Sequence, residues 1–236
     1  MSGLPQVHPA GKLAHSPPDA RHQSITVNHR LTVFIEQPPE FVRKLYPSAV
    51  WRMDPDERAV YLTFDDGPIP EVTPWVLDLL DKYDIKATFF MVGDNIRKHP
   101  DEFQMVVERG HRIGNHTFNH LRGFEYNFKD YLANAEKANE VMKTDLFRPP
   151  HGHMGWTQYM ILKRRYKIIM WDLVTRDYSK KLRGPQVLAN VMRYARNGSI
   201  ITFHDSLKSW NNGNLQYALP RAIEFLKEEG YEFRLL

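Results

Sequence analysis

The stretch "YLTFDDGP", from Tyr61 to Pro68, joins an apolar run to two adjacent carboxylates and a Gly-Pro turn. Its β-branched and aromatic residues predict a buried strand that ends at Asp65 and Asp66. Two like charges at the end of a buried strand repel one another and are costly to desolvate, so this position requires a nearby cation. In α/β barrels the active site lies at the carboxyl ends of the strands, so the stretch predicts a site as well as a strand.

Similar runs recur along the chain and alternate with longer amphipathic segments. Seven runs predict strands at residues 59–66, 87–93, 111–116, 146–150, 167–174, 199–205 and 231–236. Six segments between them predict helices at residues 72–83, 100–110, 128–143, 155–166, 184–197 and 214–230. This alternation predicts an α/β fold, a distorted (β/α) barrel with about seven parallel strands. The alternative is an open doubly wound sheet.

The part of the chain before the first strand has a different character. Residues 1 to about 30 are polar and rich in proline and histidine, without hydrophobic periodicity, which predicts a flexible extension. In the following residues 34–53 the apolar side chains of Phe41, Leu45, Val50 and Trp51 predict a segment that docks on the main domain. We therefore expect an N-terminal extension over residues 1–57 and one main domain over residues 58–236.

The composition limits the classes of function. With 236 residues, 42% hydrophobic and 25% charged, the chain resembles an ordinary globular protein and has no apolar stretch long enough for a transmembrane segment. A net charge of +4 is too small to indicate a nucleic-acid partner. The first residues lack the apolar core of a signal peptide, so the location stays open: cytoplasmic as the sequence reads, or the cell envelope if a signal has been removed. The oligomeric state stays open.

The residue types available for a metal site are restricted, because the chain has no cysteine. In "HTFNH", His116 and His120 are four residues apart, so one helical turn would place both imidazoles on one face. Together with one of the two aspartates they would supply three protein ligands, the number that a catalytic zinc site uses. The other aspartate could accept a proton from a water that the ion activates. The sequence thus predicts one divalent ion, with Zn²⁺ as the expected metal.

Other histidines and tryptophans receive simpler interpretations. His99, His111 and His153 are expected to be solvated and to lie outside the site. Trp171 is expected to pack in the core, whereas Trp210 fits either packing or stacking on a sugar ring.

Five motifs, in the order "TFDDGP", "HTFNH", "RPPHG", "RDY" and "ITFHD", resemble those of the NodB-type polysaccharide deacetylases, carbohydrate esterase family four. The resemblance covers about residues 59–236. It implies a distorted (β/α) barrel that uses one divalent ion to remove acetyl groups from N- or O-acetylated sugars. The implied substrate is a polysaccharide such as peptidoglycan, a chitin-like polymer or xylan.

The resemblance also assigns roles in the first half of the site. Asp66, His116 and His120 correspond to the metal ligands of the family, and Asp65 corresponds to its catalytic base. Arg148 corresponds to the arginine that holds the base. A neighbouring guanidinium favours the ionised carboxylate, the form that accepts a proton.

In the second half of the site, His204 resembles the general acid and Asp177 the carboxylate that pairs with it. An anion beside His204 favours the imidazolium, which can donate a proton near neutral pH. Three substrate-binding positions depart from the family pattern. His151 stands in place of a tyrosine whose backbone N–H binds the oxyanion, Tyr178 replaces a tryptophan, and Thr202 replaces the leucine of the acetyl-methyl pocket. Thr202 is expected to make that pocket more polar, unless its hydroxyl bonds to a neighbouring strand.

Two alternative functions remain. One is an inactive barrel that binds carbohydrate, which the complete set of base, acid and metal ligands disfavours. The other is a hydrolase of a different amide, such as a cyclic imide, that uses the same residues.

Overall fold

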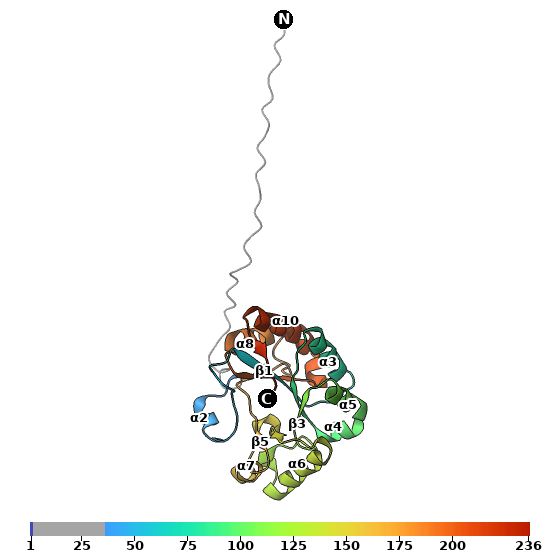
Figure 1. Ribbon diagram of the computed structural model, residues 1–236, viewed down its shortest axis with the longest axis vertical. Coiled ribbons are helices and arrows are strands. Elements are labelled where there is room, and N and C mark those ends of the chain that lie inside the picture. The colour runs from blue at the N-terminus through green and yellow to red at the C-terminus, as the bar shows by residue number, and fades with distance from the viewer. Residues whose placement is uncertain (2–35) are drawn as a thin grey trace. The chain divides into compact units, whose positions relative to one another are not determined.

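A curled parallel sheet surrounded by helices forms the centre of the protein (Figure 1). The computed structural model describes Met1 and residues 36–236. Seven strands follow the order β5-β4-β3-β2-β1-β7-β6, and β8 pairs with β1. The strands are β1 (Ala59–Asp65), β2 (Thr88–Met91), β3 (Arg112–Asn115), β4 (Leu146–Phe147), β5 (Lys167–Ile168), β6 (Leu173–Val174), β7 (Ser199–His204) and β8 (Glu232–Phe233).

Strand β1, which contains the opening motif, lies in the middle of the sheet. All seven of its residues are buried, and both of its edges are paired, one with β7 and the other with β2 and β8. Its register aligns Asp65 with His204 of β7 and with Phe90 of β2. Adjacent parallel strands are about 4.8 Å apart, so the register places Asp65 and His204 side by side at the carboxyl ends.

One continuous segment supplies both outer strands of this order. Residues 167–174, predicted as a single strand, form β5, which pairs with β4, and β6, which pairs with β7. The prediction of one strand is wrong because the segment crosses from one neighbour to the other and loses strand pairing in between. Since its two halves contact opposite edges, the sheet curls into a distorted barrel. The predicted fold class is confirmed, and the open doubly wound alternative does not apply.

Helices pack around the sheet (Figure 1). The six predicted helices are present as α3 (Thr73–Lys82), α5 (Pro100–Glu108), α6 (Phe128–Met142), α7 (Trp156–Leu162), α8 (Gly184–Tyr194) and α10 (Asn214–Glu228). Four to six residues form each of the helices that the sequence did not predict, α2 (Glu40–Arg43), α4 (Gly93–Lys98) and α9 (Leu207–Asn211). Such lengths are too short to show a helical period. Two short 3₁₀ turns, Gly123–Glu125 and Pro150–Gly152, lie in loops.

The main core lies between the central strands and the helices outside them. Phe64 of β1 stacks on Phe89 of β2 with ring centroids 4.9 Å apart and on Phe203 of β7 at 6.3 Å. The same core contains buried residues of α3 and α10, such as Leu77 and Leu219. This packing fixes β1 and β7, and therefore the strand ends that carry the candidate site.

Residues 36–57 pack against the barrel, whereas residues 2–35, most of the predicted extension, lie outside the described residues. Trp51 is buried, as predicted. Phe41 and Leu45 were expected to dock but are 63% and 57% exposed. Tyr46 is buried instead and packs in a core cluster that Val42 also contacts. Both pairs are spaced by four residues, so the pattern alone could not decide which pair faces inward. The domain boundary at residue 57 remains a prediction.

Two ion pairs hold this N-terminal segment in place. Glu36 pairs with Arg176 at 2.6 Å, and Arg43 pairs at 2.6 Å with the fully buried Asp172. Asp172 also accepts two hydrogen bonds from Arg196. Asp172 therefore links Arg43 of the segment to the barrel.

Among residues 36–236, no helix is both long enough and apolar enough to cross a bilayer.

Candidate active site

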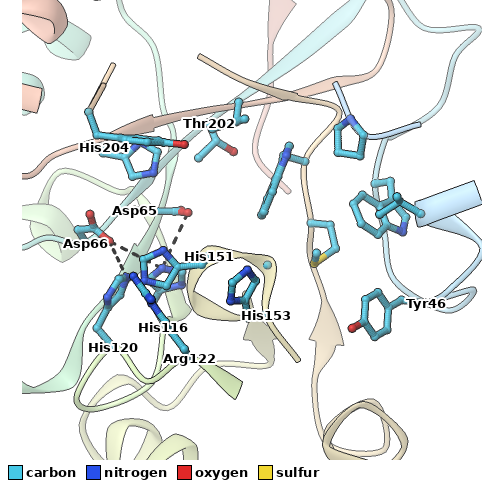
Figure 2. A pocket seen from close by; sticks show the side chains of 18 of the residues that line it. Tyr46, Asp65, Asp66, His116, His120, Arg122, His151, His153, Thr202 and His204 are labelled. Carbon is cyan, nitrogen blue, oxygen red and sulfur yellow. Dashed lines mark ion pairs between the residues drawn. The ribbon is translucent and has the colours of Figure 1, made fainter. Parts of the chain in front are cut away.

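A cavity of about 640 Å³ opens at the carboxyl ends of the central strands. Figure 2 shows acidic and histidine side chains gathered at one end of it and Tyr46 at the other. Eight of the ten predicted site residues line it: Asp65, Asp66, His116, His120, His151, Tyr178, Thr202 and His204. The remaining two, Arg148 and Asp177, are fully buried behind this lining, where they contact Asp65 and His204.

The three predicted metal ligands converge. One ligand atom from each of Asp66, His116 and His120 lies within 4.8 Å of the others. The Nε2 atoms of His120 and His116 are 3.0 and 3.8 Å from Oδ1 of Asp66. His116 Nδ1 donates to the carbonyl oxygen of Arg148 at 2.7 Å, which leaves the Nε2 lone pair directed to the site. This arrangement fits a divalent ion, because one carboxylate oxygen and two imidazole nitrogens that can act as ligands lie within 4.8 Å of one another.

The pKa values of Asp66 and His116 are both shifted in the direction that favours binding of a cation. Burial alone would raise the pKa of the Asp66 carboxyl, but the hydrogen bond from His120 and the nearby imidazoles lower it below its usual range. Burial lowers the pKa of His116 to about 4, so this imidazole is neutral near pH 7. A carboxylate and a neutral imidazole are the protonation states in which these side chains bind metals.

The two histidines of "HTFNH" do not share a helical turn, so that part of the prediction is wrong. Residues 116–120 form a loop after β3, with φ of 63° at Thr117 and 55° at His120. Asn115 holds the loop, since its Oδ1 accepts the Thr117 N–H at 2.8 Å and its Nδ2 donates to the Ala135 carbonyl. The loop brings the ring centroids of His116 and His120 to 5.1 Å. The two imidazoles are therefore close together, as predicted, but a loop and not a helical turn brings them together.

Asp65 and Arg148 form a buried pair. Arg148 Nη1 donates to Asp65 Oδ1 at 2.7 Å and to Thr63 Oγ1 at 2.8 Å. Its Nη2 donates to the Met170 carbonyl, and its guanidinium lies 4.0 Å from the centroid of the Phe90 ring. With this many partners the arginine is rigid, and it fixes one carboxylate oxygen of Asp65 while Oδ2 faces the candidate metal ligands, 4.0 Å from His116 Nε2.

His204 and Asp177 form the second pair. Asp177 Oδ1 lies 2.8 Å from His204 Nδ1, and its Oδ2 accepts the His204 backbone N–H at 2.8 Å. Burial alone would lower the pKa of His204, but Asp177, with smaller contributions from Asp66 and Asp65, raises it to about 9. The imidazole is therefore protonated near neutral pH, with Nδ1 bound to Asp177 and Nε2 as its other proton-bearing atom.

The three predicted substrate-binding residues all lie in the cavity wall. His151 has φ 59° and its ring lies 4.8 Å from that of His120, while the Tyr178 ring lies edge-on to His204 at 4.7 Å. Thr202 Oγ1 lies 3.1 Å from Thr63 Oγ1 on the neighbouring strand. Thr202 therefore both faces the cavity and bonds across the sheet.

Some residues outside the prediction also position the site. Asn95 Nδ2 donates to the Asp66 carbonyl at 2.7 Å and so fixes a backbone with φ 86°. Nothing in the sequence around Asn95 indicates this contact. Thr63, by contrast, lies two residues before Asp65, so the alternation of strand faces could have identified it.

Two expectations about histidines outside the site are corrected. His153 lines the cavity instead of facing only solvent. His111 is buried and accepts the Ala87 N–H, and burial lowers its pKa to about 4. Trp171 packs against the core cluster of Trp51, as expected, with the two ring centroids 6.4 Å apart, and it also lines the cavity. Its place depends on Gly152, because a Cβ there would lie 2.6 Å from the indole. Trp210 was expected either to pack or to stack on a sugar ring. Its ring lies edge-on to that of Trp75 at 5.4 Å between centroids, which favours packing.

A left-handed backbone is unusually frequent around the cavity. Asp66, Thr117, His120 and His151 all have positive φ, as does Arg176, the neighbour of Asp177. Side chains with a Cβ disfavour this conformation. The surrounding hydrogen bonds must therefore impose it, and it directs the candidate ligands toward one another.

Comparison with known proteins gives the same assignment as the motifs. Residues 52–164 match the family model described as polysaccharide deacetylase. A peptidoglycan-N-acetylglucosamine deacetylase of Bacillus cereus is 33% identical over 192 residues, which cover 78% of this chain and 88% of that protein.

Solved structures agree. A peptidoglycan N-acetylglucosamine deacetylase in complex with 4-naphthalen-1-yl-N-oxidanyl-benzamide superposes with a TM-score of 0.74 at 29% identity, covering 84% of this chain and 94% of that one. A pseudoenzyme of carbohydrate esterase family four from Bacillus anthracis gives a TM-score of 0.69 at 27% identity, covering 79% and 66%. The chain therefore belongs to the polysaccharide deacetylase family.

Proposed function

We propose that the protein is a metal-dependent hydrolase that removes acetyl groups from N-acetylglucosamine units of a polysaccharide, with peptidoglycan as the first candidate. The observation that carries the proposal is the convergence of Asp66, His116 and His120 beside Asp65, with His204 next to Asp65 in the register. The similarity to a peptidoglycan-N-acetylglucosamine deacetylase supports the choice of substrate.

One carboxylate and two imidazoles form a donor set that suits Zn²⁺ and similar divalent ions. When bound by Asp66, His116 and His120, the ion supplies Lewis-acid chemistry and makes a water more acidic. The remaining steps belong to the side chains around it.

In the proposed mechanism Asp65 accepts the proton of the attacking water. Arg148 holds Asp65 Oδ1, so Oδ2 is the oxygen that receives the proton. The backbone N–H of His151 stabilises the negative charge that develops on the acetyl oxygen. His204 then donates its Nε2 proton to the leaving amine, and Asp177 keeps His204 in its protonated form until that step.

Acetate release tests the proposal. Purified protein loaded with Zn²⁺ should release acetate from N-acetylated peptidoglycan, and a chelator should stop the reaction until Zn²⁺ is added again. Chitin oligomers and acetylated xylan, assayed in parallel, separate the possible glycans. Hydrolysis of a cyclic imide without acetate release would favour the other amide hydrolase, and binding of glycan without any turnover would favour an inactive barrel.

A further inference from the structure

We infer that the site accepts N-acyl groups considerably longer than acetyl, in an apolar branch of the cavity that the N-terminal segment helps to form. We call this branch the acyl arm and define it by Val42, Tyr46, Trp51, Met170, Trp171 and Val174. The inference rests on the proposed function, because it names the acyl group that the same site would cleave.

The acyl arm begins next to the reacting groups. Thr202 lies two residues before His204 on β7, so both side chains project from the same face of the strand. Thr202 is paired in register with Val174 of β6. A threonine side chain is smaller than that of a leucine, so it leaves more space beside the candidate acid and base. The cavity continues past Thr202.

From Val174 the arm continues along the segment that closes the barrel. Met170 donates its backbone N–H to the Val50 carbonyl at 2.8 Å, which places residues 50–51 against residues 169–171. The rings of Trp171 and Trp51 meet at 6.4 Å. Tyr46 lines the far end of the cavity, opposite the candidate metal ligands in Figure 2, and Val42, which packs against the core cluster of Tyr46, also lines the cavity. The wall of the arm therefore includes the N-terminal segment that the ion pairs of Glu36 and Arg43 hold in place.

The chemistry of the arm favours an alkyl chain over a sugar ring. The hydroxyl of Tyr46 donates to the Met154 carbonyl, and that of Thr202 is used by Thr63. The indole nitrogens of Trp51 and Trp171 have no hydrogen-bond partner, and both are buried, so they are not accessible to a ligand in the cavity. Sugar hydroxyls would lose their water here without gaining partners from these four side chains, whereas methylene groups gain from burial.

Asp65, Asp66, His116, His120 and His151 gather at the other end of the cavity, and His153 lies between the two ends (Figure 2). Arg122 is exposed and lies beside the candidate metal ligands in Figure 2. A substrate with a polar glycan and an apolar acyl chain would thus match the two ends of the cavity.

Two measurements test the inference. The first is kcat/KM for amine release from one glucosamine oligosaccharide that carries an acetyl, butanoyl or hexanoyl group. The second is the Kd with which the Asp65→Asn variant binds each of the same three compounds. Binding is measured by tryptophan fluorescence and requires no turnover. We expect the wild-type hexanoyl-to-acetyl ratio of kcat/KM to be about 1 or higher, and the hexanoyl compound to bind at least about tenfold more tightly than the acetyl compound.

Val42→Trp fills the far end of the arm and should lower the hexanoyl-to-acetyl ratio of kcat/KM by at least about tenfold. Leu45→Trp is the matched control, since it adds the same indole on the exposed side of the segment. It should leave the ratio within about twofold.

The possible outcomes separate the two proposals. Efficient acetyl release with a hexanoyl ratio below about one hundredth would overturn the acyl arm and leave the proposed function intact. If the hexanoyl-to-acetyl ratio of kcat/KM is high and Val42→Trp does not lower it, the alkyl chain binds elsewhere in the protein. This result would also overturn the acyl arm. If no compound is hydrolysed, the proposed function fails. The Kd values still test the acyl arm, because equal affinity for all three acyl groups would contradict it.

Discussion

Asp177 contacts His204 through both carboxylate oxygens, and this contact makes the pH dependence of activity predictable. A general acid must be protonated, so kcat/KM should fall as pH rises through the pKa of His204, about 9. In Asp177→Asn the anion that raises this pKa is lost, while burial still lowers it. The alkaline decline should therefore move toward neutral pH, which a pH series of kcat/KM will measure. An unmoved alkaline limb in the variant would contradict the role of His204.

Asp65 and Asp66 are adjacent, yet the proposal gives them different tasks. Asp65→Asn keeps an oxygen for Arg148 and removes only the proton acceptor, so kcat should fall by about 10² to 10⁴. Zn²⁺ should remain bound, because Asp66 and the two histidines are unchanged. Asp145→Asn, at an exposed carboxylate, is the control and should keep full activity. Near-normal turnover of Asp65→Asn would show that another group is the base.

Most of these residues could be predicted individually, because the ordered motifs fix residue types at strand ends. The geometry of Asp66, His120 and His151 could not be predicted in this way, since a left-handed backbone depends on partners such as Asn95 that are distant in sequence. The same limitation applies to His111. Its burial results from packing on Phe89 and from the Ala87 N–H, neither of which is visible in the surrounding residues.

Asp172 is one of the two acidic partners that anchor the N-terminal segment, residues 36–57, through ion pairs. Asp172→Ala leaves Arg43 and Arg196 without their shared carboxylate, and both arginines retain partial contact with water. We expect a loss of about 3 kcal/mol in the free energy of unfolding, the lower end of the range for a broken buried pair.

Urea denaturation measures this loss. Asp145→Ala breaks an exposed pair with Arg112 and should cost less than about 1 kcal/mol. Equal midpoints for the two variants would show that Asp172 does not anchor the segment.

The elements that the sequence predicted well are those with a long repeating pattern. Helices α3, α6 and α10 each span 10 or 15 residues with an apolar face, and β1 and β7 are the longest strands. Residues 167–174 carried an equally strong strand pattern, but hydrophobicity does not record which neighbour a strand pairs with. The closure of the barrel is therefore a property of long-range pairing, and only the structure reveals it.

Metal binding should stabilise the whole molecule, because the ligands come from separate parts of the chain that meet only in the folded state. A free ion concentration of 100 times Kd adds about 2.7 kcal/mol to the free energy of unfolding. Thermal unfolding with Zn²⁺ and with a chelator should therefore give a higher Tm in Zn²⁺.

The variant His120→Ala should lose most of this increase in Tm, since it removes one of three ligands. His99→Ala, which removes a histidine outside the cavity lining, should retain it. The same gain of Tm in both variants would mean that Zn²⁺ binds elsewhere.

The residues with left-handed backbone around the cavity also determine whether activity or secondary structure is lost first on heating. Each non-glycine residue in this conformation costs about 1–2 kcal/mol, and all five of these residues lie in the loops that carry or flank the candidate site residues. Those loops can relax by local opening while the packed strands and helices stay folded. Catalysis should therefore disappear at a lower temperature than the helical signal, and the interval between the two temperatures is a measure of the strain that keeps the site assembled.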